Sequence, residues 1–212
     1  EDHPFVVDDM LIQAKDLKDG MVLPVKNMAK EDWMFTVKNI NGIELTKEFG
    51  WFIGMFITDG YYSRGFNEGT IGWEIGVVQK DKETTDRLMK AMNDAGMNPN
   101  LYEKENGYII RVYSKEWTQF LSETMHIGKG SKRKCLPPNI LQYNEEFIKG
   151  VVAGIIDGDG CVLPDEYGTT INIGVASHGM VSQLQYILDV MGINSHCHMQ
   201  FEEGKIQIAT IH

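Results

Sequence analysis

The sequence is short of cysteine, of long apolar runs and of basic side chains, and each shortage excludes a class of protein. Among its 212 residues are three widely spaced cysteines with no C-x-x-C pair, Cys135, Cys161 and Cys197. This pattern excludes a disulfide framework and a zinc ribbon, so we expect reduced thiols. No apolar run reaches the roughly 20 residues that a bilayer-spanning helix needs, and no basic-then-apolar leader opens the chain. We therefore expect an intracellular protein, in cytoplasm or nucleoid, with no membrane partner.

Basic residues are outnumbered, with 20 Lys and Arg against 30 Asp and Glu, which gives a formal net charge of −10. Phosphate contacts normally need a basic surface, so this total argues against a polyanionic partner. The distribution is uneven, however, because Lys205 is the only Lys or Arg after Lys149. The candidates for contact with nucleic acid lie earlier: Arg64, Lys80, Lys104, Arg111, Lys115, Lys129, Lys132 and Arg133.

Two similar units organise most of the chain. Each opens with a nearly all-apolar segment, Phe49 to Ile57 and Phe147 to Ile156, that is followed by Asp-Gly pairs. Segments that are apolar around most of their circumference are predicted to be buried helices. Each is followed by a strand, a second helix, a glycine at the end of that helix and a hairpin. The predicted ranges are strands 73–78 and 170–176, helices 81–95 and 179–191, Gly96 and Gly192, and hairpins 101–113 and 196–211.

The repeat divides the chain into residues 1–45, a first repeat over 46–138 and a second over 139–212. The first repeat continues through a predicted helix at 114–124 and a loop rich in Gly and Lys at 127–138. The second repeat has no counterpart of these two segments. We therefore expect the second repeat to be truncated at its C-terminus.

Asp59 and Asp159 occupy matching positions at the C-terminal ends of the two predicted buried helices. A helix C-terminus disfavours a carboxylate by about 0.3–1 kcal/mol. Gly54 and Gly154 would let the helix backbones approach, so the two carboxylates would also repel each other. Divalent cations such as Mg²⁺, held by the carboxylates and backbone carbonyls, offset both costs and support phosphodiester cleavage. One Asp-Gly pair alone indicates only a helix stop, but two at matched positions favour a site.

Two segments, FIGMFITDG at residues 52–60 and VAGIIDGDG at residues 152–160, resemble the paired motifs of LAGLIDADG homing endonucleases. The second is close, whereas the first has Ile57 where the motif has its first Asp. The resemblance implies an α+β fold of two pseudo-symmetric αββαββα repeats packed through their motif helices and preceded by a short β-rich segment. It also implies a monomer that cleaves double-stranded DNA, one strand for each repeat, with Mg²⁺ or Mn²⁺ as cofactor. The residues it assigns are the catalytic carboxylates Asp59 and Asp159, which are metal ligands together with Thr58 and Gly158.

Two further site residues follow from the resemblance to this family and its intein members. Lys134, in the run Lys134-Cys135-Leu136-Pro137, matches a lysine before an apolar-Pro pair in the loop that leads to the second motif. It would polarise the scissile phosphate or tune the attacking water, although a solvated basic loop is the alternative interpretation. Gln79, at the end of the first predicted strand, resembles the polar residue of this family that positions water, although a glutamine at a strand end is usually only solvated. With Gly76 aligned to Gly174, the counterpart of Gln79 in the second repeat is Ser177.

Residues 1–25 resemble part of an intein splicing (Hint) domain, in which His3 would be the histidine that activates the scissile peptide. The segment is predicted to form short strands at 5–7 and 21–25 around a turn at 17–20. On this resemblance, the partners of an intact intein are its host exteins. Splicing also needs an N-terminal Cys or Ser and a C-terminal His-Asn, which this sequence does not contain, so the chain alone is not expected to splice.

Two functions therefore remain open. The first is a site-specific, metal-dependent DNA endonuclease embedded in an intein. The alternative is a decayed, non-cutting insertion that only binds nucleic acid or supports the splicing domain. The net charge of −10 and the few basic residues of the second repeat favour the alternative.

Overall fold

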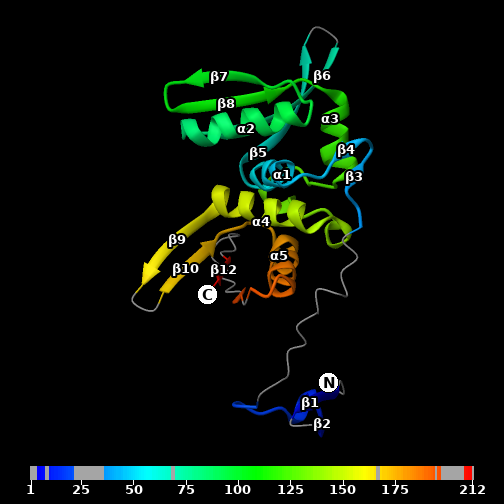
Figure 1. Cartoon of the computed structure of the whole chain (residues 1–212), viewed down its shortest axis with the longest axis vertical. Coiled ribbons are helices and arrows are strands. Elements are labelled where there is room, and N and C mark those ends of the chain that lie inside the picture. The colour runs from blue at the N-terminus through cyan, green and yellow to red at the C-terminus, as the bar shows by residue number, and fades with distance from the viewer. Residues whose placement is uncertain are drawn as a thin grey trace.

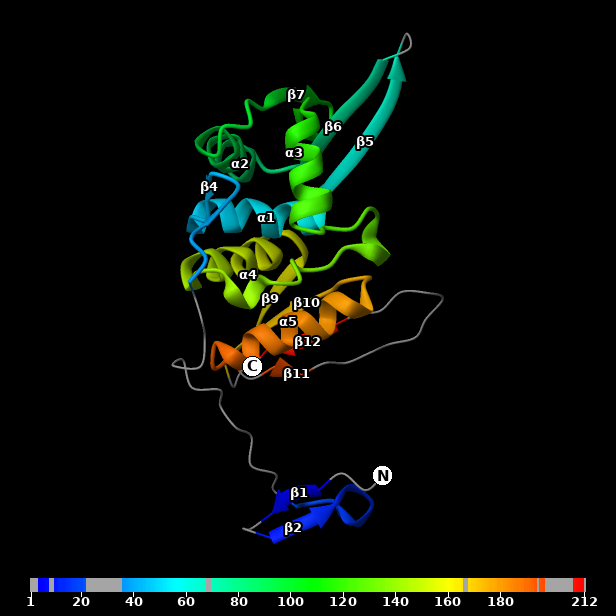
Figure 2. The ribbon, with the colours of Figure 1, turned by 90° about the vertical axis from the view of Figure 1, so that its right-hand side faces the viewer.

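A computed structural model describes residues 4–7, 10–21, 36–67, 70–165, 168–193, 195–196 and 208–211 of the chain. Two helices at the centre, α1 (Lys47–Asp59) and α4 (Glu145–Asp159), lie side by side in both views (Figure 1, Figure 2). One repeat extends from each of these motif helices. The predicted α+β arrangement, with two repeats packed through the motif helices, is confirmed.

Each repeat carries a four-stranded antiparallel sheet with the same strand order. The first sheet runs β5-β6-β8-β7 and the second runs β9-β10-β12-β11. Their strands are β5 (Gly60–Asn67), β6 (Thr70–Gln79), β7 (Asn100–Lys104), β8 (Gly107–Val112), β9 (Gly160–Asp165), β10 (Gly168–Ile173), β11 (Ser195–His196) and β12 (Ile208–Ile211). The shared order confirms the internal repeat that the sequence predicts.

A second helix follows the first two strands of each repeat, α2 (Lys82–Asp94) in the first and α5 (His178–Val190) in the second. Gly96 and Gly192 follow these helices with φ angles of 82° and 76°, as expected for glycines at a helix end. The starts of the motif helices are fixed by side-chain caps, because Thr46 and Asn144 accept hydrogen bonds from backbone amides three residues later.

The two repeats differ in the length of their first hairpin. Gly60 pairs with Val77 across β5 and β6, whereas Gly160 pairs with Ile173 across β9 and β10. Val77 therefore corresponds to Ile173, and two residues further along Gln79 corresponds to Val175. The predicted matches of Gly76 with Gly174 and of Gln79 with Ser177 are wrong. Ser177 is the N-cap residue of α5, as Asp81 is of α2.

The predicted helix at 114–124 begins as α3 (Lys115–Gln119) and continues as a π-helical segment, Phe120–Thr124. The hydroxyls of Thr118 and Ser122 each donate to a carbonyl four residues earlier at 2.7 Å, which competes with regular α-helical bonding. The wider turns end in the loop that carries the basic residues.

The N-terminal segment forms a hairpin of β1 (Pro4–Val7) and β2 (Met10–Gln13), which lies apart from the two repeats in Figure 1. The predicted strand at 5–7 is confirmed, but it pairs with β2. Of the predicted strand at 21–25, residues 22–25 lie outside the described part of the chain, as does His3. A second hairpin, β3 (Asn39–Ile40) with β4 (Ile43–Glu44), precedes α1.

The motif helices supply the largest buried side chains. Trp51, Phe52 and Phe56 of α1 and Phe147 of α4 are all less than 2% exposed. The rings of Phe49 and Phe147 lie 6.0 Å apart across the helix pair, so the core is continuous from one repeat to the other. Despite their apolar character, none of the helices in the described ranges has the length and hydropathy needed to cross a membrane.

Candidate active site at the ends of the motif helices

Glycines allow the two motif helices to pack backbone against backbone. A Cβ added at Gly54 would lie 2.3 Å from the carbonyl oxygen of Val151, and one at Gly154 would lie 2.1 Å from that of Trp51. The close approach predicted at Gly54 and Gly154 is therefore confirmed. Three further glycines, at 50, 150 and 158, make equally close contacts that the sequence analysis missed. Their spacing of four residues, which keeps them on one helix face, was the available indication.

This packing brings the ends of the two helices together. A Cβ at Gly158 would lie 2.0 Å from Oγ1 of Thr58, so the residues that precede the two carboxylates lie against each other. Burial raises the pKa of Asp59 above its usual range. Partial burial and the nearby charge of Asp59 raise the pKa of Asp159. The two carboxylates therefore converge and repel each other, as the sequence predicts.

Gln79 is the direct partner of the first carboxylate. Its Nε2 donates a hydrogen bond of 2.7 Å to Oδ2 of Asp59 from the end of β6, and this bond opposes the rise in the pKa of Asp59. In the second repeat, the position that corresponds to Gln79 is occupied by Val175, a buried apolar residue. The two halves of the cluster are therefore unequal: among the residues that the structure describes, Asp59 has an amide that orients it and Asp159 does not.

Lys134 lies beside both carboxylates, but its hydrogen bonds go to the backbone. Its Nζ donates to the carbonyl oxygens of Phe56, Thr58 and Gly60 at 3.2, 2.8 and 2.8 Å, so all three ammonium N–H groups are used. Burial lowers the pKa of Lys134 to about 8, against the opposing effect of Asp59 and Asp159. Lys134 thus places a cation at the C-terminus of α1, where the helix dipole favours positive charge.

The donor atoms fit a hard cation that is only partly enclosed by protein. Within the described ranges, no group of three or more His, Cys, Asp or Glu residues is arranged so that it could hold a metal ion. The candidate ligands are therefore the carboxylates of Asp59 and Asp159 and the carbonyls of Thr58 and Gly158. The carbonyl of Thr58 already accepts a hydrogen bond from Lys134 and keeps one lone pair. Such an incomplete oxygen set suits Mg²⁺, which keeps waters and takes phosphate oxygens as further ligands.

The predicted nucleic-acid contacts form two groups. Lys129, Lys132 and Arg133 are exposed in the loop after α3, which Figure 2 shows beside the end of α1 from which β5 departs. Lys80, Lys104 and Lys115 are exposed around the first sheet. The side chain of Arg64 lies outside the described part of the structure.

Arg111 belongs to a polar cluster on the face of the first sheet. Its Nε lies 3.5 Å from Oε1 of Glu74, and its guanidinium lies 5.2 Å from the ring centroid of Tyr102. Tyr61 donates a hydrogen bond of 2.9 Å to the same Glu74 oxygen. Arg111 is therefore paired with Glu74, whereas Lys129 and Lys132 are exposed in the loop.

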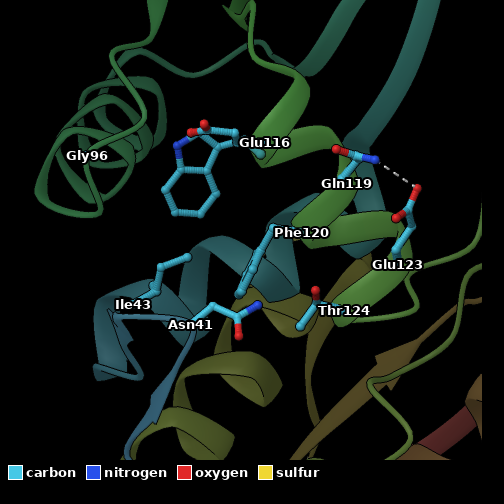
Figure 3. A pocket seen from close by; sticks show the side chains of 9 residues that line it. Asn41, Ile43, Gly96, Glu116, Gln119, Phe120, Glu123 and Thr124 are labelled. Atoms are coloured by element: carbon cyan, nitrogen blue, oxygen red, sulfur yellow. Dashed lines mark hydrogen bonds between the residues drawn. The ribbon is translucent and has the colours of Figure 1, made fainter.

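A cavity of about 510 Å³ lies between the β3–β4 turn and α3 (Figure 3). Asn41, Trp117 and Glu123 are among the residues that line it. None of the four cluster residues Asp59, Gln79, Lys134 and Asp159 contributes to its wall. The candidate site is thus an open junction of two helix ends and is separate from this cavity.

Two repeats that join through glycine-packed helices and present a carboxylate at each helix end define the class of protein. Residues 46–125 and 146–208 match the family described as the LAGLIDADG-like domain. The chain belongs to this family.

Three archaeal proteins are among the curated relatives that match part of this chain. Subunit Rpo1C of the DNA-directed RNA polymerase of Methanocaldococcus jannaschii is 29% identical over 129 residues, which are 59% of this chain and 14% of that protein. The uncharacterized protein MJ1054 of the same organism is 24% identical over 196 residues, 86% of this chain and 21% of that protein. The ATP-dependent DNA helicase Hel308 of Thermococcus kodakarensis is 28% identical over 151 residues, 69% of this chain and 13% of that protein. The chain therefore spans only a small part of the length of these relatives.

Solved structures show the same fold at low sequence identity. I-DmoI in complex with DNA and Mn has a TM-score of 0.61 at 12% identity, covering 80% of this chain and 91% of that one. I-DmoI has also been solved with DNA and Ca. The N-terminal LAGLIDADG domain of DUF199/WhiA has a TM-score of 0.51 at 9% identity, covering 91% of this chain and 88% of that one.

Proposed function

We propose that this domain is a site-specific endonuclease that hydrolyses phosphodiester bonds in double-stranded DNA with Mg²⁺ or Mn²⁺. The observation that carries the proposal is the convergence of Asp59 and Asp159 beside Lys134 and Gln79 at the ends of two glycine-packed helices. Two adjacent carboxylates with raised pKa values are costly in an apolar helix pair, and a cation between them offsets that cost.

Each residue of the cluster has a distinct role in the proposal. Asp59 and Asp159, with the carbonyls of Thr58 and Gly158, would hold the divalent ions, whose chemistry when bound would be to activate a water and stabilise the leaving oxygen. Gln79 fixes the rotamer of Asp59 through its hydrogen bond of 2.7 Å. Lys134 fixes the backbone around Asp59 and keeps a positive charge near the scissile phosphate.

DNA is proposed to lie along the sheets of both repeats, with its phosphates near the open helix junction. The exposed cations Lys129, Lys132 and Arg133 flank that junction, and Lys80, Lys104 and Lys115 extend the basic surface along the first sheet. The second repeat has few cations, so the first repeat supplies most of the phosphate contacts. Because one chain carries both repeats, it acts as a monomer.

An intein is the proposed setting of the domain. The relatives include an RNA polymerase subunit and a helicase, and the matching segment covers only 14% and 13% of their lengths. A segment shared by proteins of such different activity behaves as an insertion that is independent of its host. The resemblance of residues 1–25 to a splicing domain, with His3, supports this setting, in which exteins flank the element inside the cell.

The test is cleavage of a plasmid that carries the host coding sequence joined without the inserted element. With Mg²⁺, the intact protein should linearise this plasmid and leave one carrying the interrupted gene uncut. The variant Asp59→Ala/Asp159→Ala should bind the target and cut neither strand. Failure of the wild type to cut the joined site with either Mg²⁺ or Mn²⁺ would contradict the proposal.

A second candidate function is a non-cutting insertion that only binds nucleic acid or supports the splicing domain. The replacement of Gln79 by Val175 beside the second carboxylate favours it, as does the net charge of −10. Metal binding separates the two candidates, because a domain that only supports its host has no reason to keep a cation site. Absence of Mg²⁺, Mn²⁺ and Ca²⁺ binding by the wild type would favour this second function.

A further inference from the structure

Two side chains at equivalent positions cross from one repeat to the other. Arg87 is the sixth residue of α2, and Gln183 is the sixth residue of α5. Arg87 contacts the second motif helix, and Gln183 contacts the loop that precedes that helix. Neither residue belongs to the carboxylate cluster. Each contacts a chain segment that carries a residue of the cluster.

Arg87 and Trp51, both from the first repeat, hold Asp157 of the second. The indole Nε1 of Trp51 donates a hydrogen bond of 2.7 Å to Oδ2 of Asp157. The Arg87 guanidinium lies 3.8 Å from the Trp51 ring centroid, with Nη1 3.5 Å from the same carboxylate oxygen. Two further bonds of 3.1 Å join Arg87 to Glu48. Asp157 is two residues before Asp159, so these contacts fix the last turn of α4 against α1.

Gln183 makes the reverse connection, from the second repeat to the loop of the first. Its Oε1 accepts from the backbone N–H of Leu136 at 3.0 Å, and its Nε2 donates to the carbonyl of Leu136 at 3.4 Å. Leu136 is fully buried and lies two residues after Lys134. One amide therefore satisfies both backbone groups of a buried residue and fixes the segment from which Lys134 reaches α1.

The two contacts differ because the two motifs differ. Asp157 of the second motif corresponds to Ile57 of the first, which is buried and offers no hydrogen bond. A side chain from α5 therefore has no carboxylate to bind, and Gln183 uses the backbone of Leu136 instead. Exposed ion pairs alone contribute little, and the side chains of Arg87 and Asp157 are 42% and 48% exposed. Trp51 is 1% exposed, so its buried indole is the rigid member of the contacts that hold Asp157.

We propose that Arg87 and Gln183 are positioning residues of the site, each acting from the opposite repeat. Arg87 fixes Asp159 through Asp157 and Trp51, and Gln183 fixes Lys134 through Leu136. The proposal rests on the proposed function for the role of Asp159 as a metal ligand. The contribution of Gln183 to the burial of Lys134 can be tested without metal or DNA.

The Arg87 half is tested by calorimetric titration of Mg²⁺ and Ca²⁺ into wild type, Arg87→Leu and Arg87→Lys, well below the unfolding temperature of each. Loss of a residue that orients a ligand typically weakens metal binding by about tenfold or more, and Arg87→Leu should do so. Arg87→Lys keeps the charge and should recover part of the affinity. Lys90→Leu on the same helix, which breaks only an exposed pair with Asp94, should bind like the wild type.

The outcomes are distinguishable. Wild-type binding together with unchanged binding by Arg87→Leu overturns the positioning role and leaves the proposed function standing. A wild type that binds neither of these cations, nor Mn²⁺, overturns the proposed function and, with it, the role of Arg87. Asp157→Asn provides a second variant in case Arg87→Leu does not fold, and weaker binding is expected there as well.

The Gln183 half is tested by amine labelling of the folded, metal-free protein, with each lysine quantified by mass spectrometry. Lys134 is 7% exposed and should be protected in the wild type, while the exposed Lys132 reacts. Gln183→Leu should raise the labelling rate of Lys134 severalfold and leave Lys132 unchanged. Gln183→Glu keeps the acceptor for Leu136 N–H and should restore part of the protection.

Gln185 provides the matched control, because it lies on the same helix and donates to the backbone carbonyl of Ser195 within its own repeat. Gln185→Leu should leave Lys134 protected. Unchanged protection in Gln183→Leu, or an equal loss in Gln185→Leu, would overturn the role assigned to Gln183.

Discussion

At the scale of single residues, the two carboxylates illustrate a conflict between stability and the proposed function. Asp59 and Asp159 have pKa values above the usual 3.8 because burial disfavours their charged forms. The folded protein therefore holds protons more tightly than the unfolded chain at these positions. Folding stability from these groups is fully present below about pH 3.8 and is lost as the pH rises through their folded-state pKa values.

Asp59→Asn/Asp159→Asn should accordingly unfold at a higher temperature than the wild type at pH 7. We expect a rise of about 2 °C, kept modest because solvent screens Asp159. The difference should shrink as the pH falls through the folded-state pKa values and should be gone below about pH 3.8, where the carboxyls are protonated in both the folded and the unfolded protein. Thermal unfolding followed by circular dichroism over this pH range measures it. A lower unfolding temperature for the variant at pH 7 in metal-free buffer would contradict the electrostatic account.

Lys134→Met should destabilise the fold, because the carbonyls of Phe56, Thr58 and Gly60 lose the Lys134 ammonium that donates to all three. Leaving buried acceptors unsatisfied costs about 1–3 kcal/mol, and urea unfolding at pH 7 measures the loss. Lys132→Met, in the same loop but exposed, should change the unfolding free energy by less than about 0.5 kcal/mol. Equal stabilities for the two variants would show that the three hydrogen bonds do not hold the end of α1.

The carboxylates, Gln79 and Lys134 were predictable from the sequence because they lie within or near recognisable motifs. The counterpart of Gln79 was not, since the first hairpin of the second repeat is shorter and the pairing of Gly160 with Ile173 makes Val175 the match. Arg87 and Gln183 carry no local pattern. Their partners, Asp157 and Leu136, lie far away in the chain, so only the fold brings them together.

At the scale of elements, the helix pair depends on the absence of side chains along one face of each motif helix. The helices themselves were predictable, because their apolar runs and the Gly96 and Gly192 stops follow from periodicity and local geometry. The depth of their packing was only partly predictable. Gly54 and Gly154 indicated it, whereas the contacts of the other interface glycines emerged from the structure.

Gly154→Ala places a Cβ 2.1 Å from the carbonyl of Trp51 and 3.0 Å from the Cα of Gly54, and backbone atoms cannot give way as a flexible side chain does. We expect a loss of about 2–4 kcal/mol in unfolding free energy, measured by urea denaturation. Gly179→Ala on α5, where a Cβ meets nothing within 4 Å, should be neutral or stabilising by up to about 1 kcal/mol. Similar effects at the two positions would contradict the glycine-packed interface.

At the scale of the whole molecule, a net charge of −10 must coexist with the proposed binding of a polyanion. The chain concentrates exposed cations beside the helix junction, where Lys129, Lys132 and Arg133 occupy one loop. A local basic surface can bind DNA despite an acidic total, because screening limits the reach of distant charges to about 10 Å at 0.1 M salt.

The triple variant Lys129→Gln/Lys132→Gln/Arg133→Gln should therefore bind DNA more weakly, with a shallower dependence on salt. Each lost phosphate contact reduces the log–log salt slope by about one, so three contacts reduce it by about three. Fluorescence anisotropy with a DNA duplex in Ca²⁺ buffer measures the slope. Lys82→Gln/Lys90→Gln on α2, whose lysines pair with Asp86 and Asp94, is the control and should leave it unchanged. An unaltered slope in the triple variant would remove this loop from the DNA surface.

The most direct measurement of the central claim is calorimetric titration of Mg²⁺ into the wild type and into Asp59→Ala/Asp159→Ala. Our account predicts binding by the wild type and no binding by the double variant, because the two carboxylates are the charged ligands at the helix junction. Binding that survives in the double variant would place the cation elsewhere. Absence of binding in both proteins, with Mn²⁺ as well as with Mg²⁺, would contradict the proposed metal-dependent nuclease site.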